Sequence, residues 1–277
     1  MKIAVASGKG GTGKTLIAVN LALSLGAVQL LDCDVEEPND HLLLNSQILK
    51  EEPVKLMVPK ILEERCDYCG ECARFCQFNA LFVVGETAMV FPELCHSCGG
   101  CSIVCPRDAI VEEPRQIGKI FTCQAGDIEL IYGELKIGEA LSVPVISSVK
   151  DRMKEGTVIL DSSPGSACPV VETVHGTDFC LLVTEPTPFG LHDLKVATEV
   201  VRILDIPLGV VVNFAGIGDR DVYDFCEREG IPILMEIPYD RRIAELYSRG
   251  IPFVEKMPEW KEKFRALADR IRMEVSK

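Results

Sequence analysis

A glycine-rich loop close to the start of the chain carries the residue types that bind phosphate. Residues 8–15 match the pattern G-x-x-x-x-G-K-[ST] in full, between a β-prone run and a helix-prone run. Glycines let backbone N–H groups turn onto phosphate oxygens, because no Cβ atom blocks the approach. We expect the Lys14 ammonium to reach the β- and γ-phosphates and the Thr15 hydroxyl to bind Mg²⁺. The predicted nucleotide-binding residues of this loop are Gly8, Lys9, Gly10, Gly11, Thr12, Gly13, Lys14 and Thr15.

Acidic residues follow two apolar runs that we expect to be strands beside this loop. Residues 28–34 end in Asp32 and Asp34, and residues 157–161 end in Asp161. A carboxylate at the carboxyl end of a strand next to a phosphate loop is placed to orient Mg²⁺ or the attacking water. Asp161 is therefore predicted to bind Mg²⁺ through a water molecule. For Asp34 the alternative is a strand-end acid that caps a loop.

Eight of the thirteen cysteines form two runs with the same spacing. Residues 66–76 and 95–105 each read C-x2-C-x2-C-x3-C. In bacterial two-cluster ferredoxins with this spacing, three cysteines of a run bind one cubane and the fourth binds the other. We therefore assign one [4Fe–4S] cluster to Cys66, Cys69, Cys72 and Cys105, and the other to Cys95, Cys98, Cys101 and Cys76.

Zinc is the alternative metal for these cysteines. A zinc site needs four ligands, typically in C-x2-C pairs, rather than two triplets that are each followed by a further cysteine. The first run ends in Cys76 and Gln77, where ferredoxins usually carry Cys-Pro, while the second run keeps Pro106. Proline is not a ligand, so this departure does not affect cluster binding. His96 lies between two ligands and is expected to stay outside the ligand set.

The elements that position these residues alternate along the rest of the chain. Apolar runs near residues 1–7, 178–184, 208–213 and 233–240 read as further strands, and the steps between successive α/β elements take a dozen or more residues. This pattern predicts an α/β fold with a mostly parallel sheet and helices on both faces. Residues 120–124, 133–139 and 143–147 are expected to form short strands and turns that lead back to this sheet.

The tail of the chain, residues 258–277, is predicted to be a helix. Its apolar residues recur at spacings of three and four, which is typical of an amphipathic helix. We expect it to pack on the sheet, because acidic residues interrupt its polar face; a membrane-surface helix is the alternative. The apolar stripe consists of Trp260, Phe264, Leu267 and Ile271.

Composition limits the classes of function. The chain has 277 residues and a formal net charge of −13, which argues against a nucleic-acid-binding surface. We find neither a signal peptide nor an apolar run of about 18 residues, and so expect a cytoplasmic protein without stable membrane insertion. Metal binding is then favoured over disulfides for the cysteine runs. Cys123, Cys180 and Cys226 are expected to be buried.

Lys9 makes the glycine-rich loop resemble that of one class of P-loop ATPases. The sequence G-K-G-G-T-G-K-T resembles the deviant Walker A motif of the MinD/ParA/Mrp and nitrogenase-iron-protein (SIMIBI) class. The resemblance covers essentially the whole chain. It implies an ATPase domain of residues 1–56 and 114–277, with an α+β two-cluster ferredoxin domain inserted at residues 57–113. It also implies a dimer that closes on ATP, in which Lys9 reaches the partner's nucleotide; a solvated surface lysine is the alternative.

The same resemblance implies roles for four residues along the ATPase domain. Asp34 falls on the position of the water-orienting aspartate, and Asn213 on that of an asparagine that contacts adenine. Pro238 and Asp240 match an element that lines the base.

Cys168 is a candidate ligand by resemblance alone. It stands seven residues after Asp161, at the offset of a cysteine in the nitrogenase iron protein that binds a cluster shared between two subunits. Cys168 is thus a candidate for a third, subunit-bridging cluster or metal. A small loop residue or a redox-sensitive thiol is the alternative.

These features lead to one main hypothesis and two alternatives. The main hypothesis is a slow, partner-stimulated, Mg²⁺-dependent ATPase with Lys9, Lys14 and Asp34 as catalytic residues. It would bind ATP or ADP and two [4Fe–4S] clusters, and couple dimer closure to assembly or delivery of an iron–sulfur or related metal cofactor, with electron supply. Its partners would be an identical subunit or close paralogue, a cofactor client or accessory protein, and a redox donor or acceptor. The alternatives are an ATP-gated low-potential electron-transfer protein and a positioning or partitioning ATPase without redox output.

Overall fold

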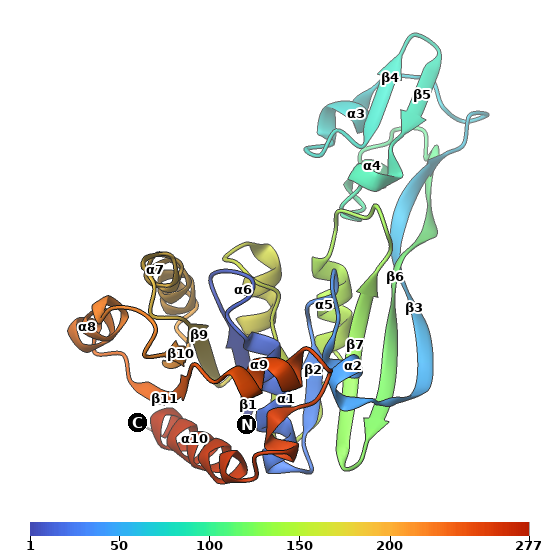
Figure 1. The fold of residues 1–277 in the computed structure, drawn as a ribbon. Coiled ribbons are helices and arrows are strands. Elements are labelled where there is room, and N and C mark those ends of the chain that lie inside the picture. Colours follow the sequence, from blue (N-terminus) through green and yellow to red (C-terminus); the bar gives the residue numbers. More distant parts are fainter. Residues whose placement is uncertain (277) are drawn as a thin grey trace. The chain divides into compact units, whose positions relative to one another are not determined.

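The computed structural model describes residues 1–276, which divide into two compact units (Figure 1). Unit 1 consists of Met1–Glu52, Ile120–Glu134 and Ile146–Lys277, and contains the glycine-rich loop. Unit 2 consists of Pro53–Lys119 and Leu135–Val145, and contains both cysteine runs. The predicted insertion at residues 57–113 therefore falls inside unit 2, which also includes flanking segments.

The main sheet has nine strands in the order β11-β10-β9-β1-β8-β2-β7-β6-β3. Every neighbouring pair from β11 to β7 is parallel, which confirms the predicted α/β fold with a mostly parallel sheet. A two-residue turn at residues 126–127 joins β6 to β7, a connection that only antiparallel strands allow. The strands are β1 (Lys2–Ala6), β2 (Gln29–Asp32), β3 (Gln47–Ile61), β4 (Leu81–Val84), β5 (Thr87–Val90), β6 (Ile110–Ala125), β7 (Ile128–Leu135), β8 (Val158–Asp161), β9 (Phe179–Thr184), β10 (Leu208–Ala215) and β11 (Ile233–Pro238).

Two hydrophobic clusters cover opposite faces of the sheet in unit 1. Along β1, Ile3 and Val5 belong to one cluster and Ala4 and Ala6 to the other, because alternate strand residues point to opposite faces. The first cluster includes α1 and α10, and the second includes α6, α7 and α8. The helices are α1 (Lys14–Leu25), α2 (Asp40–Leu44), α3 (Glu71–Phe75), α4 (Gly100–Ile103), α5 (Val143–Lys150), α6 (Cys168–Val174), α7 (Pro188–Ile203), α8 (Asp221–Glu229), α9 (Arg241–Tyr247) and α10 (Glu259–Val275), with short 3-10 turns at Pro92–Leu94 and Phe253–Glu255.

The register of the central strands brings the functional loops to one edge of the sheet. Asp161 on β8 is paired with Val5 on β1 and with Asp32 on β2. The loops that follow these three parallel strands therefore begin side by side, at the carboxyl edge where open α/β sheets bind ligands.

The C-terminal helix α10 packs on the first face, as predicted. The four residues of its apolar stripe are all buried. The Trp260 ring meets the Phe253 ring edge-on, and the Phe264 ring is tilted against it. Cys123, Cys180 and Cys226 are also buried, as expected.

Residues 143–147 form a helix, so the predicted strand there is wrong. The valines and isoleucine of this stretch favour a strand locally. The side chains that are actually buried are Val145, Ile146 and Val149, a spacing that fits one helix face. Pro144 is tolerated because it lies in the first turn of α5, where its missing N–H leaves no bond unmade. Residues 120–124 belong to the much longer strand β6.

In unit 2 the two cysteine runs repeat the same backbone path. Tyr68 and Ser97 follow the first cysteine of each run by two residues, and both have left-handed backbones with φ of 58° and 56°. Each run then enters a short helix, α3 or α4, after a glycine with positive φ. The antiparallel β4–β5 hairpin connects the two halves.

Candidate nucleotide cleft and cysteine cavities

The glycine-rich loop joins β1 to α1, and close packing explains two of its glycines. A Cβ atom at Gly8 would lie 2.3 Å from the carbonyl oxygen of Asp193. A Cβ atom at Gly13 would lie 2.6 Å from the Asn213 side-chain nitrogen, and the backbone φ of Gly13 is +94°. Lys14 is the first residue of α1 and is only 6% exposed. Burial lowers the pKa of Lys14, and the Asp161 and Asp34 carboxylates oppose this shift.

The two predicted Mg²⁺ ligands lie in direct contact. The Thr15 hydroxyl donates to Asp161 Oδ2 at 2.6 Å, and Asp161 is buried at the end of β8. Burial raises the pKa of Asp161 to about 7. A magnesium ion supplies the charge that would keep this carboxylate ionised, and a hydroxyl and a carboxylate are the hard oxygen ligands that it prefers.

Asp34 lines the same cleft as the phosphate loop. Burial raises its pKa to about 6, with Lys14 opposing the shift. A carboxylate with a pKa near neutrality can accept a hydrogen bond from a water molecule and also take its proton. The position and the chemistry of Asp34 thus suit the water-orienting role that the resemblance implies.

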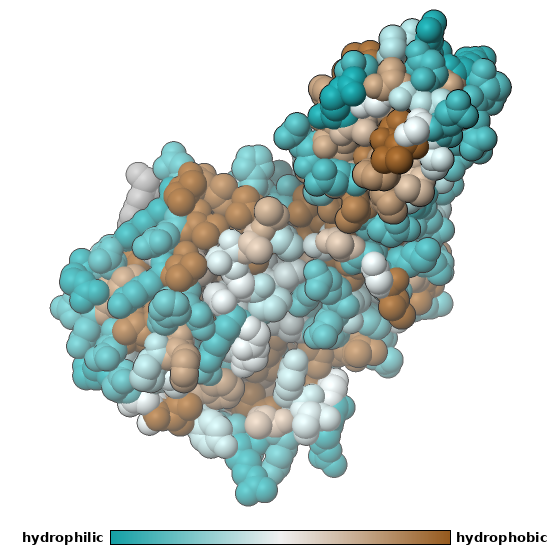
Figure 2. Space-filling view, turned by 90° about the horizontal axis from the view of Figure 1, so that it is seen from above, coloured by the Kyte–Doolittle hydropathy of each residue, from teal (hydrophilic) through white to brown (hydrophobic). Residues whose placement is uncertain are grey.

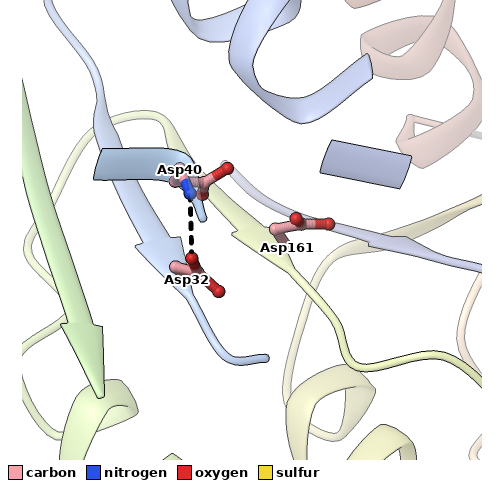
Figure 3. Close-up of side chains that lie close together, drawn as sticks. All are labelled: Asp32, Asp40 and Asp161. Atoms are coloured by element: carbon pink, nitrogen blue, oxygen red, sulfur yellow. Dashed lines mark hydrogen bonds between the residues drawn. The ribbon is translucent and has the colours of Figure 1, made fainter. Parts of the chain in front are cut away.

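A third acid, Asp40, joins Asp32 and Asp161 in a buried triad that the sequence did not reveal (Figure 3). One ligand oxygen from each residue lies within 4.8 Å of the others. Asp32 accepts backbone N–H bonds from Asp34, Asn39 and Asp40, which folds the loop back and places the start of α2 beside β8. Neither carboxylate oxygen of Asp40 has a hydrogen-bond partner. One general rule could have indicated Asp40. The first turn of a helix has free N–H groups, and a nearby strand-end aspartate such as Asp32 can accept their hydrogen bonds.

Asp40→Asn should stabilise the nucleotide-free chain increasingly as the pH rises. Burial, together with Asp32 and Asp161, raises the pKa of Asp40. The folded chain therefore holds a proton that the unfolded chain releases above about pH 4, so stability falls as pH rises towards the folded pKa. We expect the gain from Asp40→Asn to grow by up to about 1.4 kcal/mol for each pH unit between about pH 4 and the folded pKa of Asp40.

Urea denaturation of the magnesium-free chain at several pH values measures this difference. Asp127→Asn, in the exposed β6–β7 turn, is the matched control and should show no such trend. A constant difference between the Asp40→Asn variant and the natural chain across this range would contradict the assignment.

The cleft beside the phosphate loop has a volume of about 310 Å³ and brings together residues from distant segments. The predicted residues Asn213, Pro238 and Asp240 all line it. The prediction did not include the apolar residues from β10, β11 and α9 that form part of its wall. These additional residues are Phe214, Ile237, Ile243, Ala244 and Tyr247.

Lys9 is held within its own chain by Glu185. The Lys9 ammonium lies 2.5 Å from Glu185 Oε1, at the carboxyl end of β9. The Thr187 hydroxyl donates to the same Glu185 oxygen and also accepts from the Gly190 N–H as the N-cap of α7. The first turn of α7 therefore fixes the carboxylate that holds Lys9.

The eight cysteines of the two runs line two separate cavities in unit 2. Each of the two cavities is lined by four of them. In both cavities three cysteines come from one run and the fourth from the other. The first cavity is lined by Cys66, Cys69, Cys72 and Cys105, and the second by Cys76, Cys95, Cys98 and Cys101.

Backbone N–H groups point at the crossing cysteines in the same way in both cavities. The Ala80 N–H donates to Cys76 Sγ at 3.4 Å, and the Ala109 N–H donates to Cys105 Sγ at 3.3 Å. Such bonds orient metal-ligating sulfurs and tune the potential of a bound cluster.

The rims of the two cavities differ at positions that the repeat makes equivalent. At the first, Arg107 and Asp67 form an ion pair at 2.7 Å. At the second, the corresponding Phe78 and His96 stack with ring centroids 3.8 Å apart. Exposed apolar residues continue around unit 2, where hydrophobic surface interrupts the hydrophilic surface (Figure 2).

Cys168 is exposed and is the first residue of α6. Within residues 1–276 it belongs to no group of three metal ligands. Its predicted role as a bridging ligand stays a prediction.

The parallel sheet, the glycine-rich loop and the cleft at the strand ends define a P-loop nucleotide-binding domain. The family of CobQ/CobB/MinD/ParA nucleotide-binding domains matches residues 3–253. The chain belongs to this family.

Two relatives and one solved structure are similar to this chain. An uncharacterized protein of Methanocaldococcus jannaschii is 34% identical over 263 residues, which is 92% of each chain. An iron-sulfur cluster carrier protein of Pyrococcus abyssi is 25% identical and is matched over 91% of this chain and 79% of its own. The fold resembles that of the septum site-determining protein MinD with Mg-ADP from Pyrococcus horikoshii, with a TM-score of 0.60, 20% identity and coverage of 98% and 95% of the two chains.

Among the described residues, no helix is both long enough and apolar enough to cross a membrane.

Proposed function

We propose that this chain is a slow, partner-stimulated, Mg²⁺-dependent ATPase that holds two [4Fe–4S] clusters. Nucleotide-driven closure of a dimer would be coupled to assembly or delivery of an iron–sulfur or related metal cofactor, with electrons supplied through the ferredoxin-like unit. The observation that carries the proposal is the presence of two four-cysteine cavities in a chain that also has a nucleotide cleft.

The ATPase chemistry follows from the residues around the cleft. Thr15 and Asp161 would hold Mg²⁺, Lys14 would neutralise charge on the β- and γ-phosphates, and Asp34 would orient the attacking water. Lys9 of a second copy would add positive charge as the bond between the γ-phosphate and the leaving ADP breaks. The match to MinD with Mg-ADP supports the fold that this arrangement needs.

The shape of the cysteine cavities supports clusters over single ions. A tetrahedral Zn²⁺ with bonds of about 2.3 Å holds its sulfurs only about 3.8 Å apart. No three cysteine sulfurs of the described residues lie within 4.8 Å of one another, so each cavity is wider than a mononuclear site. When bound, each cluster would supply one-electron chemistry at the sulfur cage. The relatives named iron-sulfur cluster carriers support a role in handling such cofactors.

A second candidate is ATP-gated electron transfer at low potential. Cysteines from both cavities pack in a single apolar cluster around Leu81, Cys101 and Ile110, so the two cysteine cavities lie next to each other. Neighbouring clusters form a short path for electrons. A protein that only carries clusters to other proteins needs one labile cluster, so the second cavity favours electron transfer. A third candidate, a positioning ATPase, leaves the eight cysteines unexplained.

Iron content during ATP turnover separates these candidates. The anaerobically reconstituted full chain would be incubated with Mg·ATP and an apo-protein that becomes active on receiving a [4Fe–4S] cluster. For delivery, we expect activation to be several-fold faster with Mg·ATP than with Mg·ADP, with matching loss of iron from the chain. Retained iron together with a nucleotide-dependent cluster potential would favour electron transfer. Retained iron and an unchanged potential would contradict both coupled functions.

A further inference from the structure

The carboxyl end of strand β10 holds an aromatic residue in an unusual backbone conformation. Phe214 has a φ of 55°, in the left-handed region that bulky side chains rarely adopt. The register between β10 and β11 shifts between Asn213 and Ala215, so Phe214 is the extra residue of a bulge. Bulges and strained residues of this kind cluster at binding sites, where they aim a side chain.

Asn213 ties this bulge to the phosphate loop. Its side-chain oxygen accepts the backbone N–H of Phe214 at 3.0 Å, and its side-chain nitrogen donates to the Thr12 carbonyl at 2.8 Å. The side chain is only 2% exposed, and Gly13 has no Cβ where this nitrogen lies. Both ends of the amide thus bond within the chain, which makes Asn213 a positioning residue for the loop and the bulge.

The bulge presents Phe214 to the nucleotide cleft. Phe214 lines the cleft together with Ile237 and Tyr247, while Gly10, Gly11 and Gly13 of the glycine-rich loop line the same cleft. The centroid of its ring lies 6.2 Å from that of Tyr239, which directly follows β11. A cleft with a phosphate-binding part and an aromatic, apolar part matches the two chemical parts of a nucleotide.

We propose that Phe214 is the stacking surface for the nucleobase and that the β10 bulge exists to aim its ring. This inference rests on the nucleotide-binding function and is independent of the cysteine cavities. Because every base has an aromatic face, such a surface sets the affinity for the base more than the choice between adenine and guanine.

Two ligands that differ only by the nucleoside test this role on the full chain. Isothermal titration would compare Mg·ADP with Mg·pyrophosphate for the natural chain and for Phe214→Gly, Phe214→Asn and Phe214→Tyr. Glycine and asparagine both accept a left-handed backbone, so these two variants lose the ring without disturbing the bulge. Phe214→Tyr keeps an aromatic ring.

We expect Phe214→Gly and Phe214→Asn to bind ADP about tenfold more weakly and pyrophosphate as tightly as the natural chain. Phe214→Tyr should bind ADP within about twofold of the natural chain, since the stacking surface remains. The nucleotide-free Phe214→Gly chain should melt no lower than the natural chain, because glycine relieves the backbone strain. Unchanged ADP affinity in both ring-deleted variants would overturn the proposal, and so would an equal loss of pyrophosphate affinity. Failure of the natural chain to bind either ligand would contradict nucleotide binding itself, and the stacking role with it.

Discussion

Lys9→Ala should lower ATP hydrolysis by about 100-fold or more while leaving the affinity for Mg·ADP within about threefold. Lys14 is already buried at the phosphate loop, and Lys9 is held by Glu185 in its own chain. In the proposed dimer, Lys9 would have to leave Glu185 before it could reach the nucleotide of the second copy. A cation that arrives only with the transition-state complex lowers the barrier without adding to ground-state binding.

Phosphate release and titration calorimetry measure the two quantities on the same preparations. Lys14→Ala is the informative control, because removing this lysine should weaken ADP binding as well as hydrolysis. If Lys9→Ala hydrolyses ATP at the natural rate, Lys9 has no role across an interface. If it loses ADP affinity to the same degree as Lys14→Ala, Lys9 acts on the nucleotide of its own chain.

Substitution of Glu185, the partner of Lys9, should change the rate of hydrolysis in the opposite direction. Glu185→Gln removes the charge that holds Lys9 but keeps a side chain of the same size, still within reach of the Thr187 hydroxyl. We expect basal hydrolysis at low protein concentration to rise about threefold to tenfold, because breaking a partly buried ion pair is no longer part of closure. A fall in hydrolysis as large as that of Lys9→Ala would instead show that the ion pair belongs to the active state.

The sequence predicts those parts of the cleft that are formed by a few consecutive residues. The phosphate loop needs only eight consecutive residues, and Asp161 needs only an apolar run before it. Parallel strands place their carboxyl ends on one edge, so residues after β8, β10 and β11 could be expected to converge without knowledge of their contacts.

The residues that were missed depend on contacts between distant segments. Glu185 lies 176 positions from Lys9 along the chain, and no local pattern pairs them. Phe214 reads as an ordinary strand residue, since only the register shift against β11 turns it into a bulge. Asp40 reads as a helix-start acid, and becomes part of the triad only because Asp32 accepts its N–H.

The long strand β3 could not be predicted for a different reason. β3 contains Pro53 and Pro59, and proline argues against a strand when strand position is unknown. β3 is the last strand of the sheet, and an edge strand has unpaired positions where a missing N–H costs little. Its polar residues are also exposed, which removes the apolar run expected of a strand in a parallel sheet.

Double substitutions of cysteine should reveal that each cluster takes ligands from both runs. Cys72 and Cys105 line one cavity although they belong to different runs, whereas Cys76 lines the other cavity with the second run. Cys72→Ala combined with Cys105→Ala should therefore leave about four of about eight iron atoms, the same as either single variant. Cys72→Ala combined with Cys76→Ala should leave almost none.

This comparison works because substitutions in one site are not additive, while those in separate sites are. Iron and acid-labile sulfide would be measured after anaerobic reconstitution of each full-length variant. Cys226→Ala, a buried cysteine of unit 1, is the control and should keep all the iron. The reverse pattern, in which the Cys72/Cys76 pair keeps half the iron and the Cys72/Cys105 pair keeps none, would mean that each run binds its own cluster. Full iron retention in all these variants would exclude the eight cysteines as cluster ligands, because a four-cysteine cage does not survive the loss of two of its sulfurs.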